Sequence, residues 1–110
     1  MKKRLAKLIA TGLLILVPAV CSADFQSGNE LYSYCTDTAA VADTYCIGYI
    51  EGIADTMRHD NNQVCGELYH VTGTQVKDIT VQFLQQHPEQ RQYAAESLVR
   101  LAMSAAFPCR

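Results

Sequence analysis

The sequence lacks the alternation of polar and apolar residues that predicts a half-buried β-strand. Its apolar residues recur instead at intervals of three and four positions, as they do along one face of an α-helix. We therefore expect an all-α fold, a small domain of four helices.

Long apolar runs are also missing, except for one near the N-terminus. That run, residues 8–17, is too short for a permanent membrane anchor. A basic segment precedes it, and the small residues Cys21-Ser22-Ala23 follow it. This order is typical of a secretory signal peptide, so we expect residues 1–23 to be removed on export to the periplasm. The alternative is a lipoprotein signal with lipid on Cys21, although Val20 stands where such signals normally carry a small residue.

Basic residues become scarce once the signal is removed. The mature chain, residues 24–110, has 87 residues, five basic and eleven acidic, and a net charge of −6. This balance disfavours nucleic acid and anionic membrane surfaces as partners and favours basic proteins. A chain of this length forms one domain with a modest core.

Four cysteines remain after export, namely Cys35, Cys46, Cys65 and Cys109. An even number of cysteines in a short exported chain predicts two disulfides, and a modest core makes them important for stability. Of the three possible connectivities we predict Cys35–Cys46 and Cys65–Cys109. The first joins two helices across a tight turn, and the second holds a loop to the end of the chain.

Catalytic and metal-binding arrangements are missing as well. His59, His70 and His87 belong to no CxxC or HxxxH pattern, and the cysteines are better used as disulfides. We therefore expect no catalytic residue, no metal ion and no cofactor, and we expect that the protein is not an enzyme.

Local signals indicate where the four helices begin and end. Two capping boxes, Ser27 with Glu30 and Thr72 with Gln75, predict the starts of the first and third helices. Apolar spacing predicts the second helix at about residues 39–59, and a loop should follow it. We expect the last helix to start at Pro88. The positions expected on inner faces include Tyr34, Leu101 and Ala105.

Two glycines, Gly48 and Gly52, interrupt the second helix. Each costs a helix interior roughly 1 kcal/mol relative to alanine. Because they are four residues apart they share one face, so we expect a neighbouring helix, the alanine-rich last one, to pack closely against them. We prefer this packing interpretation to ligand binding.

A combination of motifs extends over nearly the whole mature chain. The segment CIGYIEG at residues 46–52, with Asp55, is accompanied by Cys35, Cys65 and the terminal Phe107-Pro108-Cys109. Phe25, Gly28-Asn29, Leu31, Phe83-Leu84 and His87-Pro88-Glu89 complete the set. Together they resemble the Rap/Tai family of type VI secretion immunity proteins. The resemblance implies a helical, disulfide-bonded periplasmic protein that binds and inhibits a cell-wall amidase effector.

Candidate partner-binding residues come from one helix and one loop. Asp55 is either a structural carboxylate or a partner contact, whereas Glu51 is expected to be simply solvated. The loop over residues 60–73 lacks a packing pattern, and loops on rigid helices often carry recognition. Its candidates are Asn62, Glu67, Tyr69 and His70, and the alternative is an ordinary polar connector.

Other functions remain open at this point. A small periplasmic acid-stress chaperone would also be helical, acidic and disulfide-bonded, and so would a non-inhibitory envelope protein. The expected partner is a secreted amidase effector, with no nucleic acid and no membrane after signal removal. The sequence is also compatible with a homodimer.

Overall fold

The structure, a computed structural model, describes residues 12, 25–59 and 64–109. These residues form the helices α1 (Gly28–Thr36), α2 (Ala40–His59), α3 (Gly73–Gln86) and α4 (Ala95–Ala106), and the short 3-10 helices η1 (Gly66–His70) and η2 (Pro88–Gln90). Within these ranges the only strand-like pairing is an isolated bridge between Ser27 and Ala94. The predicted all-α, four-helix fold is confirmed. The expected signal peptide lies outside the described residues apart from Gly12 and stays a prediction.

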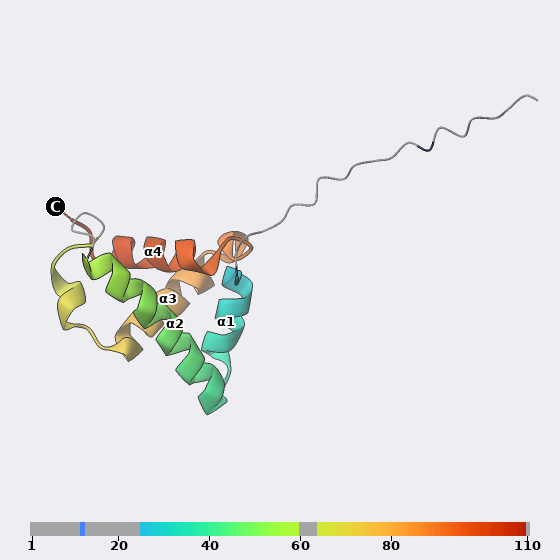
Figure 1. Cartoon of the computed structure of the whole chain (residues 1–110), viewed down its shortest axis with the longest axis horizontal. Coiled ribbons are helices and arrows are strands. Elements are labelled where there is room, and N and C mark those ends of the chain that lie inside the picture. The colour runs from blue at the N-terminus through green and yellow to red at the C-terminus, as the bar shows by residue number, and fades with distance from the viewer. Residues whose placement is uncertain (1–11, 13–24, 60–63, 110) are drawn as a thin grey trace, which may run out of the picture.

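Helix α2 is the central element of the fold. It contacts α1, α3 and α4, and its most extensive contacts are with α3. In Figure 1, α4 lies across the top of the molecule, α2 runs obliquely beneath it, and α1 closes one side. The C-terminal ends of α2 and α4 lie at the same end of the molecule (Figure 1).

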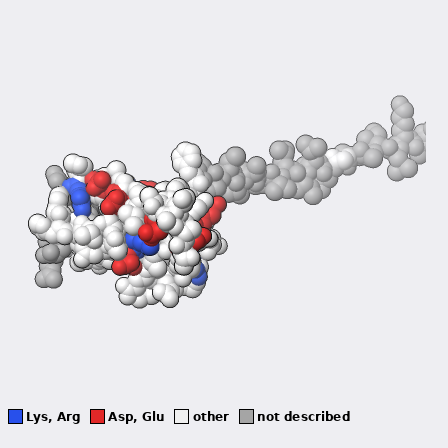
Figure 2. Space-filling view, turned by 90° about the horizontal axis from the view of Figure 1, so that it is seen from below, with Lys and Arg blue, Asp and Glu red and all other residues white. Residues whose placement is uncertain are grey.

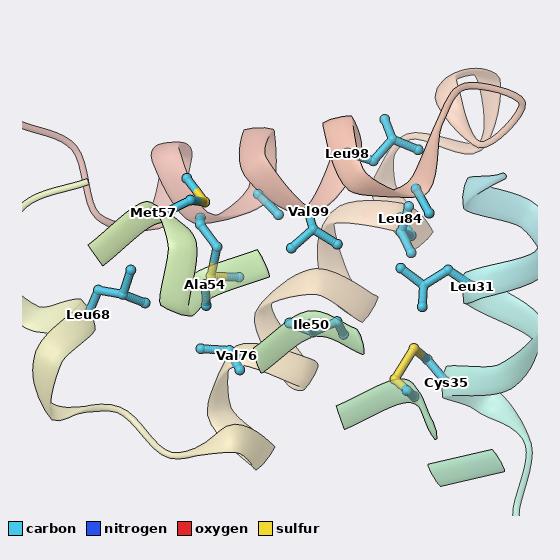
Figure 3. Close-up of a cluster of buried hydrophobic side chains, with 14 of the residues drawn as sticks. Leu31, Cys35, Ile50, Ala54, Met57, Leu68, Val76, Leu84, Leu98 and Val99 are labelled. Atoms are coloured by element: carbon cyan, nitrogen blue, oxygen red, sulfur yellow. A yellow bond between two sulfur atoms is a disulfide. The ribbon is translucent and has the colours of Figure 1, made fainter. Parts of the chain in front are cut away.

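One continuous core joins the four helices (Figure 3). From α2, Cys46, Ile50, Ala54 and Met57 are buried, at the spacing of a single helix face. They pack with buried side chains from the other elements, including Leu31, Leu68, Val76, Leu84, Leu98, Val99 and Met103. Full burial of one such large aliphatic side chain contributes about 1.5–3 kcal/mol, so this core holds the helices in place.

Both predicted disulfides are present. Cys35 and Cys46 join α1 to α2, with their Cα atoms 5.1 Å apart. Cys65 and Cys109 hold the segment before η1 to the end of the chain, at 4.9 Å. The Cys65 N–H also donates a hydrogen bond to the carbonyl of Phe107 (3.2 Å), so this attachment does not depend on the sulfur atoms alone.

The predicted start of the last helix at Pro88 is wrong. Pro88 begins the 3-10 helix η2, and α4 starts only at Ala95. The backbone that leads into α4 pairs with the backbone at the start of α1: the Gly28 N–H donates to the Tyr93 carbonyl (2.8 Å), and the Ala95 N–H donates to the Gln26 carbonyl (2.9 Å). These bonds use backbone groups that a continuous helix would need for itself.

The close packing predicted at Gly48 and Gly52 is also wrong. Both glycines are exposed, and a β-carbon built on either one would meet no atom within 4 Å from the described residues beyond its own stretch of helix. Neighbouring helices pack instead against the buried positions on the other side of α2, so the glycines face outward. Three inner-face assignments fail as well, because Tyr34, Leu101 and Ala105 are exposed.

Candidate partner-binding site

A cleft of about 340 Å³ separates the C-terminal half of α2 from the start of α3. Glu51, Asp55 and Arg58 line its α2 side at helical spacing. Thr72 and Gly73, at the N-terminus of α3, line the opposite side. Apolar side chains of Ala54, Val71 and Val76 complete the lining.

The α3 side of the cleft is fixed by the capping box that the sequence predicts. The Gln75 N–H donates to the Thr72 hydroxyl (3.2 Å), and the Thr72 N–H donates to the Gln75 side-chain oxygen (2.7 Å). Val71 and Val76 occupy the two positions of a hydrophobic staple around this cap. The entry angle of the chain into α3 is therefore well defined, and with it the shape of the cleft.

Glu51 has a more specific position than the sequence indicates. Its carboxylate lies so close to Gly73 that a β-carbon there would overlap it. The missing side chain at Gly73 thus lets an acidic group reach the first turn of α3, where the helix dipole stabilises negative charge. Sequence reasoning missed this contact because no local pattern relates positions 51 and 73.

Arg58 connects the cleft to η1. Its guanidinium donates to the carboxylate of Asp55 (3.4 Å) and to the carbonyl of Leu68 (2.7 Å). The hydroxyl of Tyr69 donates to the Arg58 carbonyl (2.6 Å), in the last turn of α2. Arg58 Nε is buried without a hydrogen-bond partner among the described residues. Asp55 and Tyr69, both predicted partner residues, are therefore brought together around one arginine.

Acidic side chains outnumber basic ones on the face shown in Figure 2. The basic side chains of the described ranges are engaged within the fold: Lys77 with Asp43, Arg100 with Glu96, Arg58 with Asp55, and Arg91 over the ring of Tyr32. Glu51 has no basic partner within the same ranges. The charge left to interact with a partner is thus mainly negative.

The predicted partner residues have different outcomes. Asp55 lines the cleft with its side chain 66% exposed, and Tyr69 and His70 are exposed in η1, in a segment that the sequence predicts to be irregular. Glu67 also belongs to η1, but its side chain lies outside the description, as does all of Asn62. The roles of these residues in binding stay predictions.

The described residues include histidines, cysteines and carboxylates, which are common ligands of metal ions. No three histidine, cysteine or acidic side chains among them are grouped so that they could hold a metal ion. The four cysteines are joined in disulfides. Within the same ranges no helix combines the length and apolar character needed to cross a membrane.

These features define a small, disulfide-bonded helical protein whose surface carries an acidic cleft. The sequence model of the Rap1a immunity proteins matches residues 27–109, so the chain belongs to this family. The resemblance inferred from the CIGYIEG segment and the terminal Phe107-Pro108-Cys109 is thereby confirmed. A comparison with curated proteins finds no match.

Proposed function

We propose that this protein is a periplasmic immunity protein, without enzymatic activity of its own, that binds and inhibits a cell-wall amidase effector of type VI secretion. The observation that carries the proposal is membership of the Rap1a immunity protein family over residues 27–109. An immunity protein acts by binding an effector protein, so its function depends on a surface.

The geometry supports a binding role centred on the cleft. Its walls belong to α2 and α3, which share one buried core, and Arg58 fastens η1 to them through the Leu68 carbonyl. A rigid surface loses little conformational entropy when it binds, which favours tight association. Exposed Asp55 and Tyr69 stand at the edge of this surface.

The excess of acidic side chains supports a basic partner. Opposite charges on two proteins accelerate their encounter, and salt screens the attraction. The association rate with the effector should therefore fall as the salt concentration rises, while the dissociation rate should change less.

Co-expression with a candidate amidase directed to the periplasm tests the proposal. Cells that make the full chain should survive, whereas cells that make the chain without residues 2–23 should lyse, because the inhibitor then stays in the cytoplasm. Survival with the cytoplasmic form would contradict the periplasmic site of action. If the full chain protects against no periplasmic amidase, and the purified protein instead suppresses aggregation of unrelated proteins at low pH, the chaperone alternative is favoured.

A further inference from the structure

One exposed stripe runs along the outer face of α2. Tyr45, Gly48, Gly52 and Asp55 follow one another at intervals of three and four residues, so they share a face of the helix. All four are exposed, and Val41, one turn before Tyr45, is 83% exposed. We call these four residues the glycine stripe.

Neither the backbone conformation nor the packing of the described residues requires glycine at positions 48 and 52. Neither glycine has a positive φ, which among the described residues is found only at Gly66, so alanine could adopt the same backbone conformation. Among the described residues beyond their own stretch of α2, no atom lies within 4 Å of a β-carbon built on either glycine. Alanine would also favour the helix. The loss of helix propensity is therefore uncompensated within the described residues, and a partner that approaches the bare backbone would compensate it.

The two ends of the glycine stripe differ in chemistry. At one end the ring of Tyr45 lies 4.6 Å from that of Tyr34 between centroids, and its hydroxyl donates to the buried side chain of Gln26 (2.7 Å). Tyr45 is thus an oriented aromatic side chain, a type enriched at interfaces. At the other end Asp55 and the neighbouring Glu51 enter the cleft.

The charge at the acidic end indicates the kind of partner. Arg58, the basic side chain that lines the cleft, is already bonded to Asp55 and to the Leu68 carbonyl. Glu51 has no basic partner among the described residues, and Asp55 is 66% exposed despite its bond to Arg58. A positively charged side chain of a partner would pair with the carboxylates of Glu51 and Asp55, whereas an anionic group would be repelled.

We propose that the effector docks lengthwise on the glycine stripe through a segment that carries at least one lysine or arginine. The segment lies over Gly48 and Gly52 with its backbone close to that of α2, and its cation enters the cleft beside Glu51 and Asp55. Tyr45 contacts the opposite end of the segment. This inference depends on the proposed function, since it assigns the surface through which the same effector binds.

Paired substitutions at the glycines test the docking geometry, with affinity for the purified effector and thermal stability as the two readouts. Gly52→Ala should raise the melting temperature by a few degrees, because it gains helix propensity without a clash. The same change should weaken binding, because a β-carbon stands where the segment lies. Gly52→Leu should weaken binding by at least about 30-fold, as at an interface hot spot. Ala105→Leu, a small-to-large change at an exposed position of α4, is the matched control and should leave the affinity unchanged.

A second pair of substitutions tests the charge. Glu51→Gln should slow association and make it less dependent on salt. Asp78→Asn removes the charge of an exposed carboxylate on α3 and serves as the control. It should have a much smaller effect, because Asp78 does not line the cleft.

The outcomes separate this inference from the proposed function. If the parent protein inhibits the effector and Gly52→Leu binds equally well, the docking surface is wrong and the function stands. If the parent protein binds no effector, both fail. A lower melting temperature for Gly52→Ala would show that the fold itself needs the glycine, which overturns the inference. It is overturned as well if Gly52→Leu abolishes a homodimer of this chain while effector affinity is retained.

Discussion

The α-carbon of Gly28 lies so close to the backbone of Arg91 that a β-carbon at position 28 would come within 2.9 Å of the Arg91 carbonyl oxygen. Two hydrogen bonds fix this approach, from the Gly28 N–H to the Tyr93 carbonyl (2.8 Å) and from the Asn29 N–H to the Arg91 carbonyl (2.7 Å). The start of α1 is thereby attached to the segment that leads into α4. This glycine, and not Gly48 or Gly52, is where two parts of the described backbone require the absence of a side chain.

Gly28→Ala is therefore expected to destabilise the protein by about 1–3 kcal/mol, the usual effect of overpacking. The neighbouring Arg91 atoms belong to the backbone, which cannot rotate away as a side chain can. Urea unfolding of the mature, oxidised protein measures the change. Gly52→Ala is the matched control and should instead stabilise by roughly 1 kcal/mol. Equal stability of Gly28→Ala and the parent protein would contradict the close contact.

The two disulfides should differ in their effect on the cleft. In the chain-entropy model, separations of 11 and 44 residues correspond to about 3 and about 4 kcal/mol of stability. Replacing Cys65 and Cys109 together by alanine should also loosen η1, and amide exchange at Leu68 should accelerate more than the loss of global stability explains. Replacing Cys35 and Cys46 together is the matched control. This change should lower global stability without the local effect at Leu68. Equal amide-exchange rates at Leu68 in the two double variants would contradict this local role of the Cys65–Cys109 disulfide.

Tyr69 is expected to have a structural role in addition to any contact with a partner. Its hydroxyl donates to the Arg58 carbonyl, which belongs to the last turn of α2, where helix carbonyls generally need partners from outside the helix. Tyr69→Phe should lower the free energy of unfolding by about 0.5–1.5 kcal/mol, the range for one hydrogen bond. If the exposed ring is also a partner contact, Tyr69→Ala should reduce effector affinity well beyond Tyr69→Phe. Equal affinities of the two variants would assign Tyr69 to structure alone.

The capping box of α1 should make stability depend on pH. The Ser27 backbone N–H, and next its hydroxyl, donate hydrogen bonds to Glu30 and hold the pKa of this carboxylate below its ordinary value of 4.5. A lowered folded-state pKa stabilises the protein above the unfolded-state pKa, and this contribution is lost as the pH falls through the folded-state value. Glu30→Gln keeps a capping side chain without a titrating group, as the Thr72–Gln75 box does in α3. As the pH is lowered below about 4.5, the unfolding free energy of Glu30→Gln should therefore decrease less steeply than that of the parent protein. Identical slopes for Glu30→Gln and the parent protein would contradict this role.

Local signals predicted local structure well. The capping boxes at Ser27 and Thr72 mark true helix starts, because cap and acceptor lie three residues apart in the sequence. The predicted cysteine pairing, chosen among three possible connectivities, is confirmed as well.

These local signals could not predict interactions between residues that are far apart in the sequence. The sequence of the second helix shows that Gly48 and Gly52 share a face, but only the packed structure shows that this face is outward. The approach of Glu51 to Gly73 and the attachment of Gly28 to Arg91 likewise depend on how the helices are arranged. The start of the last helix was misplaced for the same reason, since long-range backbone bonds occupy the residues after Pro88.

Titration of a purified amidase effector with the mature protein tests the central claim most directly. The effector should come from the same type VI secretion system, and its cleavage of peptidoglycan is the measured quantity. Our account predicts that cleavage falls in proportion to the added protein and stops near one equivalent of binding sites, because tight binding blocks the enzyme. Cleavage that continues undiminished in the presence of excess folded, oxidised protein would contradict the account.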